Sequence, residues 1–586
     1  MRLPTTRSPL VWIARCLLAA PTLGAAAAAG EPSCVCPPFR GTGGSLRAIA
    51  PDYPRLAQSP RPAFAPTATS GDVRLLVILA EFADVPSRIA PSRFVDHLFG
   101  PGPSLSDYYD EVSLGALSLD GHVHGWVALP STEFYYSQGN GGVGTYPNNA
   151  QRMAEDAVTA AISSGVDLDD YDLDSNGLVD ALLVVHSGQG LEWALPASGG
   201  SSNSTEPNAN AIVSHKWVLH ETDFGAGPNA VDYFTCPELQ LVRIDLVPAW
   251  TDSIATIGVY CHEFGHMLGL PDYYDTNTGD SRVGVWDLMD YGTWNRDPLD
   301  LHAFGSLPGH FSGWSKMFLG WTTPIEVAPL PGEEIETIVT LPSASTGGRP
   351  AQLLANSGGV DWENGAPGRG EFFVVEARTR EGYDAGLPGE GVLVYHVDEG
   401  RASNRAADFA DGAGLLLLEP QDGNVSIGET GTAGETWPGG QTSFDAASSP
   451  SSRRHGGAES GVAIETFDVT TLGSGTARIT TRVQNLESLL PVPFARPHPW
   501  RPASAARVEL VLSTFTPATA PTRVGIHDLL GRRVRSITSG SIDATGRTAT
   551  WDGRTDSGRP VASGVYFFRV EEPVASSASG RVVVLR

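Results

Sequence analysis

Long apolar runs and a helical period mark the first half of the chain. Residues 73–84 (VRLLVILAEFAD) and 181–186 (ALLVVH) are continuous apolar stretches with β-branched members, a pattern that predicts buried strands. Between them, residues 149–162 (NAQRMAEDAVTAAI) repeat their apolar positions at helical intervals. Strands that alternate with helices predict an α/β or α+β domain over residues 71–325.

After about residue 325 the pattern changes to short apolar stretches between Gly-rich turns. GVLVYHVD at Gly391 and GVAIETFDV at Gly461 are examples, and they are typical of a β-sandwich region in which we expect no catalysis. A Pro-rich stretch at 489–504 then predicts a semi-rigid linker. The short strands that follow predict a last, all-β domain.

The amino terminus has the composition of a targeting segment. Arg2 and Arg7 precede an apolar stretch that ends in small residues, the pattern of a secretory signal. Arg15 breaks this stretch, and no later stretch reaches about 18 apolar residues, so we expect an extracellular protein without a transmembrane helix. Residues 31–70 are rich in Ala, Pro and Ser without an apolar period.

These patterns together predict a multidomain chain. Its expected parts are a signal peptide at 1–30, a propeptide or disordered lead-in at 31–70, an α/β catalytic domain at 71–325, an associated β-rich domain at 326–486, a Pro-rich linker at 487–505 and an all-β domain at 506–586.

Charge narrows the range of partners. The 586 residues contain 66 acidic and 39 basic side chains, for a formal net charge of -27. Phosphate backbones and anionic membranes would repel such a chain, so we expect no nucleic-acid partner.

The string CHEFGHMLGLPD contains the most informative chemistry. His262 and His266 are four residues apart and share one face of a helix, so one zinc ion can reach both imidazoles. Glu263 beside them is placed to act as the base on a zinc-bound water. Gly269 suits a left-handed helix stop that returns the chain, which makes Asp272 the expected third ligand.

This string resembles the zincin motif of the M6 metallopeptidases, the immune-inhibitor-A-like secreted bacterial proteases. The resemblance extends over residues 73 to about 480, for example through SHKWVL from Ser214 and WDLMDYG from Trp286. It implies a zincin or metzincin-like catalytic fold with the same zinc ligands and the same general base. It also implies that Met289 forms the methionine turn under the metal and that Tyr291 supports the oxyanion, although either residue could be ordinary core.

The segment DYDLDSNGLVD predicts a structural calcium site. Its expected oxygen donors occupy EF-hand positions 1, 3, 5, 7 and 9, namely Asp172, Asp174, Asn176, the Leu178 carbonyl and Asp180. Position 12 departs from the motif, because Leu183 stands where an EF-hand has its bidentate Glu. Glu192 is a candidate for the missing oxygen donor. The alternative is a solvated acidic turn held by Asx hydrogen bonds.

The remaining candidates are cysteines and lone histidines. Cys236 and Cys261 are a plausible disulfide in an oxidising compartment. Cys34 and Cys36 in the lead-in could give a thiolate to the zinc, as in cysteine-switch zymogens, or form a disulfide or a loose tail. His186 and His215 could face the substrate, but lone histidines are more often structural.

The last 90 residues are similar to the Ig-like domains of flagellar hook-capping proteins and of type IX secretion sorting domains, through the run HDLLGRRVRSI from His527 and SGVYFFRV from Ser563. This resemblance implies contact with secretion machinery or attachment to the cell surface.

The sequence therefore predicts a secreted zinc endopeptidase that hydrolyses peptide bonds of extracellular proteins. The alternative is a surface adhesin with a structural or vestigial metal site, and Glu263 speaks against it because a structural site needs no base. A carbohydrate-active enzyme lacks an assignable carboxylate pair.

Overall fold

The computed structural model describes residues 34–35, 67–193 and 210–584, with gaps inside the last range. The gaps are 226, 244–249, 277, 300–302, 331, 357–358, 364–366, 406–407, 410, 425–430, 487–493, 497–501, 503–506, 513–522, 529–530, 539–540, 543–547 and 573–578. The predicted signal peptide, most of the lead-in and most of the Pro-rich linker lie outside the described residues.

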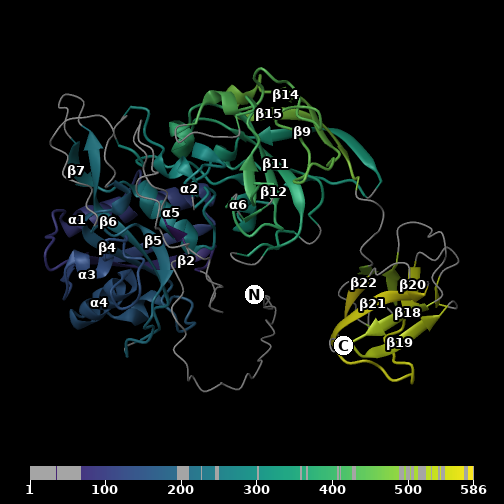
Figure 1. Cartoon of the computed structure of the whole chain (residues 1–586), viewed down its shortest axis with the longest axis horizontal. Helices are drawn as coiled ribbons and strands as arrows, with labels where there is room; N and C mark the ends of the chain where they lie inside the picture. Colours follow the sequence, from purple (N-terminus) through teal and green to yellow (C-terminus); the bar gives the residue numbers. More distant parts are fainter. Residues whose placement is uncertain are drawn as a thin grey trace, which may run out of the picture.

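A seven-stranded sheet forms the centre of the first domain (Figure 1). Its strand order is β1-β5-β6-β4-β2-β3, with β7 beside β6, and β3, β2, β4 and β6 run parallel. The strands are β1 (Cys34–Val35), β2 (Gly71–Glu81), β3 (Leu117–Ala128), β4 (Ala181–Gln189), β5 (His215–Val218), β6 (Asp232–Arg243) and β7 (Trp250–Ile254). The mixed α/β class expected from the sequence is confirmed.

Helices cover both faces of this sheet because β2 is apolar on both sides. Leu75 and Val77 pack into one hydrophobic cluster, whereas Leu76 and Ile78 pack into a second one on the opposite face. Residues of α1 (Pro91–Phe99), α2 (Leu105–Val112) and α5 (Ile257–Met267) share the first cluster, and α3 (Glu133–Ser137) and α4 (Ala150–Ser163) border the second.

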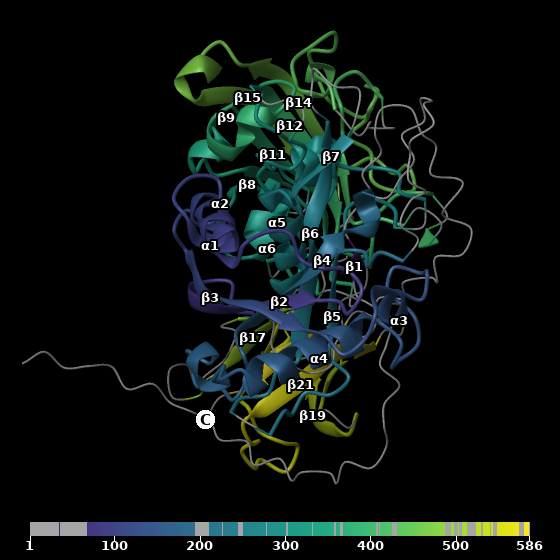
Figure 2. The same ribbon diagram turned by 90° about the vertical axis from the view of Figure 1, so that its left-hand side faces the viewer.

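The β-rich region contains two further sheets. The first has the order β13 (Leu416–Leu418), β12 (Gly391–Asp398), β11 (Glu371–Arg378), β10 (Ala351–Leu353), β8 (Ile325–Val327), and the second β14 (Val462–Asp468), β15 (Thr476–Gln484), β9 (Glu334–Pro342). Their apolar side chains belong to the same hydrophobic cluster as those of α5. Figure 2 shows β11 and β12 above α5 and α6 (Gly313–Phe318), and α6 contacts β11. The predicted boundary at 325 therefore marks a change in sequence pattern, but the residues on its two sides share one hydrophobic core.

Short helices connect these elements. They are α6 (Gly313–Phe318) and the 3-10 helices η2 (Leu168–Tyr171), η3 (Leu191–Trp193), η4 (Gly284–Trp286), η5 (Tyr291–Trp294), η6 (Ala344–Thr346), η7 (Gly382–Gly386), η9 (Ala433–Glu435) and η10 (Leu472–Ser474).

The C-terminal part is all-β, as the sequence predicts, and has a separate core around Trp551 and Phe568. Figure 1 shows it apart from the preceding domains. It has two antiparallel sheets. The first has the order β16 (Phe494–Arg496), β17 (Val508–Val511), β20 (Thr548–Trp551). The second has the order β19 (Arg533–Thr538), β18 (Arg523–His527), β21 (Gly564–Glu572), β22 (Ser579–Val584).

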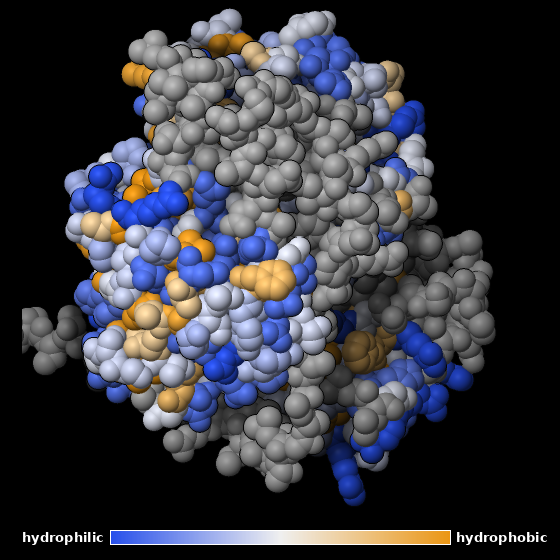
Figure 3. All heavy atoms as spheres, turned by 60° about the vertical axis from the view of Figure 1, so that its left-hand side comes forward, coloured by the Kyte–Doolittle hydropathy of each residue, from blue (hydrophilic) through white to orange (hydrophobic). Residues whose placement is uncertain are grey.

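Polar and apolar side chains are mixed on the face of the molecule in Figure 3. On this face, hydrophobic residues lie in small groups between hydrophilic ones. Among the helices of the described residues, none is long and apolar enough to cross a membrane.

The predicted disulfide between Cys236 and Cys261 is wrong. Both residues are free, fully buried thiols in the same hydrophobic cluster, one on β6 and one on α5. Burial raises the pKa of each thiol well above its usual value. The two side chains act as small apolar residues that fill the space between strand and helix.

A buried ion pair ties the β-rich region to the first domain. The Arg378 guanidinium on β11 donates to both Asp384 oxygens at 2.7 and 2.5 Å, and its Nη1 donates to the Trp286 carbonyl at 3.0 Å. Burial alone would raise the pKa of Asp384, but Arg378 and His310 hold it well below its usual value. Asp384 therefore stays ionised in the core.

We expect Arg378→Leu to destabilise the protein by about 3–5 kcal/mol, because it leaves the Asp384 charge buried without its partner. Denaturant unfolding of the purified chain measures this. The matched control is Arg482→Leu, whose pair with Glu465 lies on the surface at 3.1 Å with both side chains more than 40% exposed. That exposed pair contributes about 0–1 kcal/mol, so equal losses in the two variants would contradict the assigned role.

Candidate metal site

Helix α5 is held against the turn that follows it in the chain. Every residue of the helix is buried, and two glycines allow a close approach to its neighbours. A Cβ on Gly258 would lie 2.1 Å from the Thr293 carbonyl oxygen, and one on Gly265 would lie 2.6 Å from the Met289 sulfur. The helix therefore rests directly on the segment that contains Met289.

Three buried side chains converge at the end of this helix. His262 and His266 project from the same face, and their Nε2 atoms are 3.1 Å apart. Gly269 has a φ of +101°, the left-handed conformation predicted for it, and the chain turns back so that Asp272 faces both rings. The Asp272 Oδ1 atom lies 3.2 Å from the first Nε2 and 3.3 Å from the second.

Hydrogen bonds on the far side of each ring fix its protonation. The Nδ1 of His262 lies 3.0 Å from the Leu288 carbonyl oxygen and that of His266 lies 2.8 Å from the Leu270 carbonyl oxygen. A carbonyl accepts only, so Nδ1 carries the proton and both Nε2 atoms present lone pairs. Burial lowers the pKa of His262, which favours the neutral imidazole.

The third group is a carboxylate. Burial would raise the pKa of Asp272, but the two imidazoles outweigh burial and the pKa is lowered. Three acceptor atoms thus lie within 3.3 Å of one another. Zinc bonds of about 2.0–2.1 Å at tetrahedral angles place ligand atoms roughly 3.3 Å apart, so this donor set fits a zinc ion.

Glu263 is fully buried and follows His262 directly on α5. It is not part of the three-residue cluster of donor atoms. Its position next to the cluster, and not in it, is the arrangement that a proton acceptor beside a metal requires.

Two aspartates that the sequence analysis missed shape the turn below the helix. The Asp287 Oδ1 accepts from the Met289 backbone at 2.7 Å, while its Oδ2 accepts from the Ser312 backbone at 2.6 Å. Asp290 accepts three backbone N–H groups, those of residues 282–284, through one oxygen. Burial raises the pKa of Asp290 to about 6 against these hydrogen bonds. The sequence does contain a signal for these two aspartates, because they stand on either side of Met289 in WDLMDYG.

Tyr291 is buried in the same turn. Its hydroxyl donates to the Gly279 carbonyl oxygen at 3.2 Å. This contact occupies the proton that an oxyanion would accept, and the predicted oxyanion role stays a prediction.

The acidic loop folds as a compact turn. Asp172, Asp174 and Asp180 bring carboxylate oxygens within 4.8 Å of one another. Asp172 accepts from the backbone of Asn176 and of Gly177, both at 2.9 Å. Burial raises the pKa of Asp180, and the neighbouring aspartates add to the rise. The geometry is therefore compatible with both alternatives, a calcium loop and an Asx-stabilised turn.

Three other candidates have structural roles. Glu192 accepts from the Ser214 hydroxyl at 2.7 Å and is not part of the acidic cluster. His215 contacts the Val213 carbonyl at 2.8 Å and the Tyr233 hydroxyl at 3.0 Å, and His186 contacts the Ser187 carbonyl at 3.1 Å. Burial lowers the pKa of both histidines to about 4, so they are neutral core residues.

A short strand from the lead-in lies at the open edge of the sheet. β1 pairs antiparallel with β5, with Cys34 opposite Lys216 and Val35 opposite His215. β1 also lies beside α5. Residues 34–35 of the lead-in thus pair with β5 at the edge of the sheet, beside the helix that carries His262 and His266. Cys36 lies outside the described residues.

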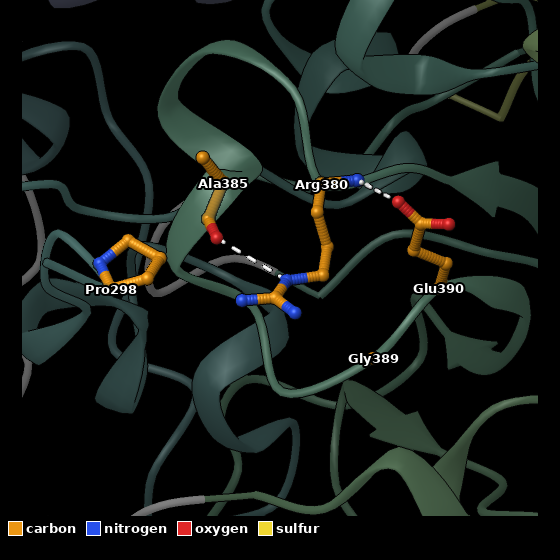
Figure 4. A pocket seen from close by; sticks show the side chains of 5 residues that line it. All are labelled: Pro298, Arg380, Ala385, Gly389 and Glu390. Carbon is orange, nitrogen blue, oxygen red and sulfur yellow. Dashed lines mark hydrogen bonds between the residues drawn. The ribbon is translucent and has the colours of Figure 1, made fainter. Parts of the chain in front are cut away.

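An open depression of about 570 Å³ lies elsewhere, between Pro298 of the first domain and residues 380–390 of the β-rich region. It is lined by Pro298, Arg380, Ala385, Gly389 and Glu390 (Figure 4). The Arg380 backbone donates to Glu390 at 2.9 Å, and its side chain donates to the Ala385 carbonyl at 3.3 Å. None of these residues offers a donor to the three-residue cluster, so the depression is not the metal site.

Two stretches of the chain match known domain families. Residues 101–323 match the family described as immune inhibitor A peptidase M6, catalytic domain, and residues 504–576 match the FlgD Ig-like domain. The chain is 29% identical over 320 residues to immune inhibitor A of Bacillus thuringiensis subsp. alesti, which covers 44% of this chain and 42% of that protein. It is 27% identical over 354 residues to pre-pro-metalloprotease PrtV of Vibrio cholerae serotype O1, which covers 52% of this chain and 36% of that protein. The chain therefore spans less than half the length of these relatives.

Two solved structures from Porphyromonas gingivalis show a weaker likeness. They are PorZ, a surface component of the type IX secretion system, at 16% identity over 37% of each chain with a TM-score of 0.14, and dimeric latent PorU, at 15% identity over 34% of this chain and 18% of that chain with a TM-score of 0.13. These scores carry no argument about fold or function.

Proposed function

Because the chain carries an M6 metallopeptidase domain, we propose that it is a secreted zinc endopeptidase that cleaves extracellular proteins. The observation that supports this most is the buried triangle of His262 Nε2, His266 Nε2 and Asp272 Oδ1 with Glu263 beside it. The metalloprotease name of the Vibrio relative agrees with the proposal. Met289 under the helix supports a metzincin-like arrangement.

Each residue of the site has its own role in the proposed hydrolysis. Zinc, when bound, polarises the scissile carbonyl and acidifies a water molecule. His262, His266 and Asp272 hold the ion, with the two Nδ1 hydrogen bonds keeping both rings oriented. Glu263 takes the proton of the attacking water and then delivers it to the leaving amine.

The alternative function is a surface adhesin with a vestigial metal site. The FlgD Ig-like domain and the β-rich region are compatible with it. We favour the peptidase because a purely structural zinc site fills its fourth position with protein and needs no adjacent carboxylate. The Ig-like domain then serves export or attachment to the cell surface.

We expect Glu263→Ala to keep its zinc and to lose proteolysis by about 10²-fold or more, because Glu263 is the proton acceptor and not a ligand. Asp272→Ala should instead lower zinc content together with activity. Zinc stoichiometry and casein turnover are measured on both purified variants. Loss of zinc from Glu263→Ala would refute its role as the base, and full zinc in Asp272→Ala would move the third ligand elsewhere.

We also propose that the lead-in is an inhibitory pro-segment. The pairing of β1 with β5 beside α5 supports this, and the relative's name, pre-pro-metalloprotease, agrees. An extended segment that adds a strand to this edge would compete with an extended peptide substrate.

A chain that begins at residue 67 should therefore cleave casein several-fold faster than one that begins at residue 31. Cys34→Ala in the longer chain separates two possible causes of inhibition, zinc binding by the thiol and strand pairing by the lead-in. Activation by this substitution alone would indicate that the thiol binds the zinc, whereas activation by truncation alone would indicate strand pairing. Equal initial rates for all three proteins would rule out an inhibitory lead-in.

Calcium binding to the acidic loop is the remaining proposal. Asp172, Asp174 and Asp180 place three carboxylates in a small volume of a chain with a net charge of -27, and a bound cation would relieve their repulsion. The loop leads directly into β4, so its order affects the central sheet.

Calcium at about 100 times its dissociation constant should stabilise the native state by roughly 2.7 kcal/mol. The melting temperature is measured in the Glu263→Ala background at fixed zinc, which prevents self-digestion. Asp174→Ala should abolish the shift, while Asp552→Ala, in the separate C-terminal domain, should leave it intact. If calcium moves neither the parent nor the Asp174→Ala curve, the loop is an acidic turn without an ion.

A further inference from the structure

A second group of metal-ligating side chains lies in the β-rich region, outside the site described above. Glu371 is the first residue of β11, His396 lies on the neighbouring strand β12, and His455 lies on the loop before β14. One donor atom from each comes within 4.8 Å of the others. The His396 Nε2 is 3.0 Å from Glu371 Oε1, and the two imidazole rings are 4.0 Å apart.

A carboxylate orients each imidazole from its far side. His396 Nδ1 lies 3.3 Å from Glu419 Oε1, and His455 Nδ1 lies 3.1 Å from Asp398 Oδ2. A carboxylate that accepts the Nδ1 proton leaves the Nε2 lone pair free to bind a metal, and such carboxylate–histidine pairs commonly support metal ligands. Each ring thus keeps its Nε2 lone pair for a metal ion.

The His455 ring provides an independent observation. Its side chain is only 8% exposed, and its Nε2 is buried without a hydrogen-bond partner in the part of the chain that the structure describes. A buried ring nitrogen normally finds a partner, so this atom needs one that the protein does not supply.

A charged imidazole alone does not account for this arrangement. His396 as an imidazolium between Glu371 and Glu419 would satisfy that ring, and these carboxylates do outweigh burial and raise its pKa. It would still leave His455 Nε2 unsatisfied. Arg454 lies 3.4 Å from Glu371 Oε2 and the His455 backbone donates to Oε1, so Oε1 keeps a lone pair for a further contact.

We propose that Glu371 Oε1, His396 Nε2 and His455 Nε2 bind a divalent transition metal, with Zn²⁺ the best match to two imidazoles and one carboxylate. The ion fastens the loop around His455 to strands β11 and β12, so its role is structural. The ring centroids lie 4.0 Å apart here, against 4.7 Å for His262 and His266. Water completes the shell, since Glu371 is 18% exposed.

Metal counting on the full chain tests the proposal. After loading with Zn²⁺ and removal of excess, the wild type should hold about two ions per chain by elemental analysis. His455→Ala and Glu371→Gln should each hold about one, as should Asp272→Ala, and the combination of Asp272→Ala with His455→Ala should hold none. His527→Ala, in the separate C-terminal domain, is the control and should hold two.

Stability supplies a second readout for variants that fold poorly. Zinc should raise the melting temperature of Asp272→Ala, in which the second site is intact, and should not raise that of the Asp272→Ala and His455→Ala combination. The proposal is overturned if His455→Ala and Glu371→Gln both retain two ions, or if wild type holds one ion that Asp272→Ala alone removes. Failure of the proposed peptidase site would give a different result, because Asp272→Ala would then hold as many zinc ions as the wild type.

Discussion

Three lone pairs aimed at one buried point are the constraint on which the first domain depends. The donors of His262, His266 and Asp272 lie 3.1–3.3 Å apart, and without a cation they repel one another. Flexible side chains would turn away from such an arrangement. They stay because both rings are fixed through Nδ1 and because the helix beneath them rests on the Met289 segment through Gly265.

That support extends far beyond the motif. Asp287 and Asp290 hold the turn, Asp287 is bound in turn by the backbone at Ser312, and Arg378 on β11 donates to the carbonyl of Trp286 just ahead of it. The β-rich region also shares its hydrophobic cluster with α5. The β-rich region therefore braces the turn beneath the candidate metal ligands, and changes in its core should reach these side chains through this turn.

Sequence reasoning succeeded where the information is local. The spacing of His262, His266 and Asp272 follows from one helix and one glycine turn, and the buried strand at 73–84 follows from its unbroken apolar run. It missed Asp287 and Asp290 because an aspartate has many uses and only the folded turn shows which one applies. The disulfide prediction failed because residue type and compartment do not determine whether two thiols in a shared core face each other. Glu371, His396 and His455 meet only after strand pairing and loop closure, so their spacing in the chain carries no motif.

The three clusters of candidate metal ligands differ in burial, and burial relates to what an ion can do in each. His262, His266 and Asp272 are almost fully buried, the group around His396 is partly open, and the aspartate loop lies largely at the surface. Nitrogen donors in a dry site favour a tightly held zinc ion, whereas exposed carboxylates favour a hard cation that exchanges with solvent. Burial also makes unbalanced donors costly, so a bound cation matters most to the cluster that is most removed from water.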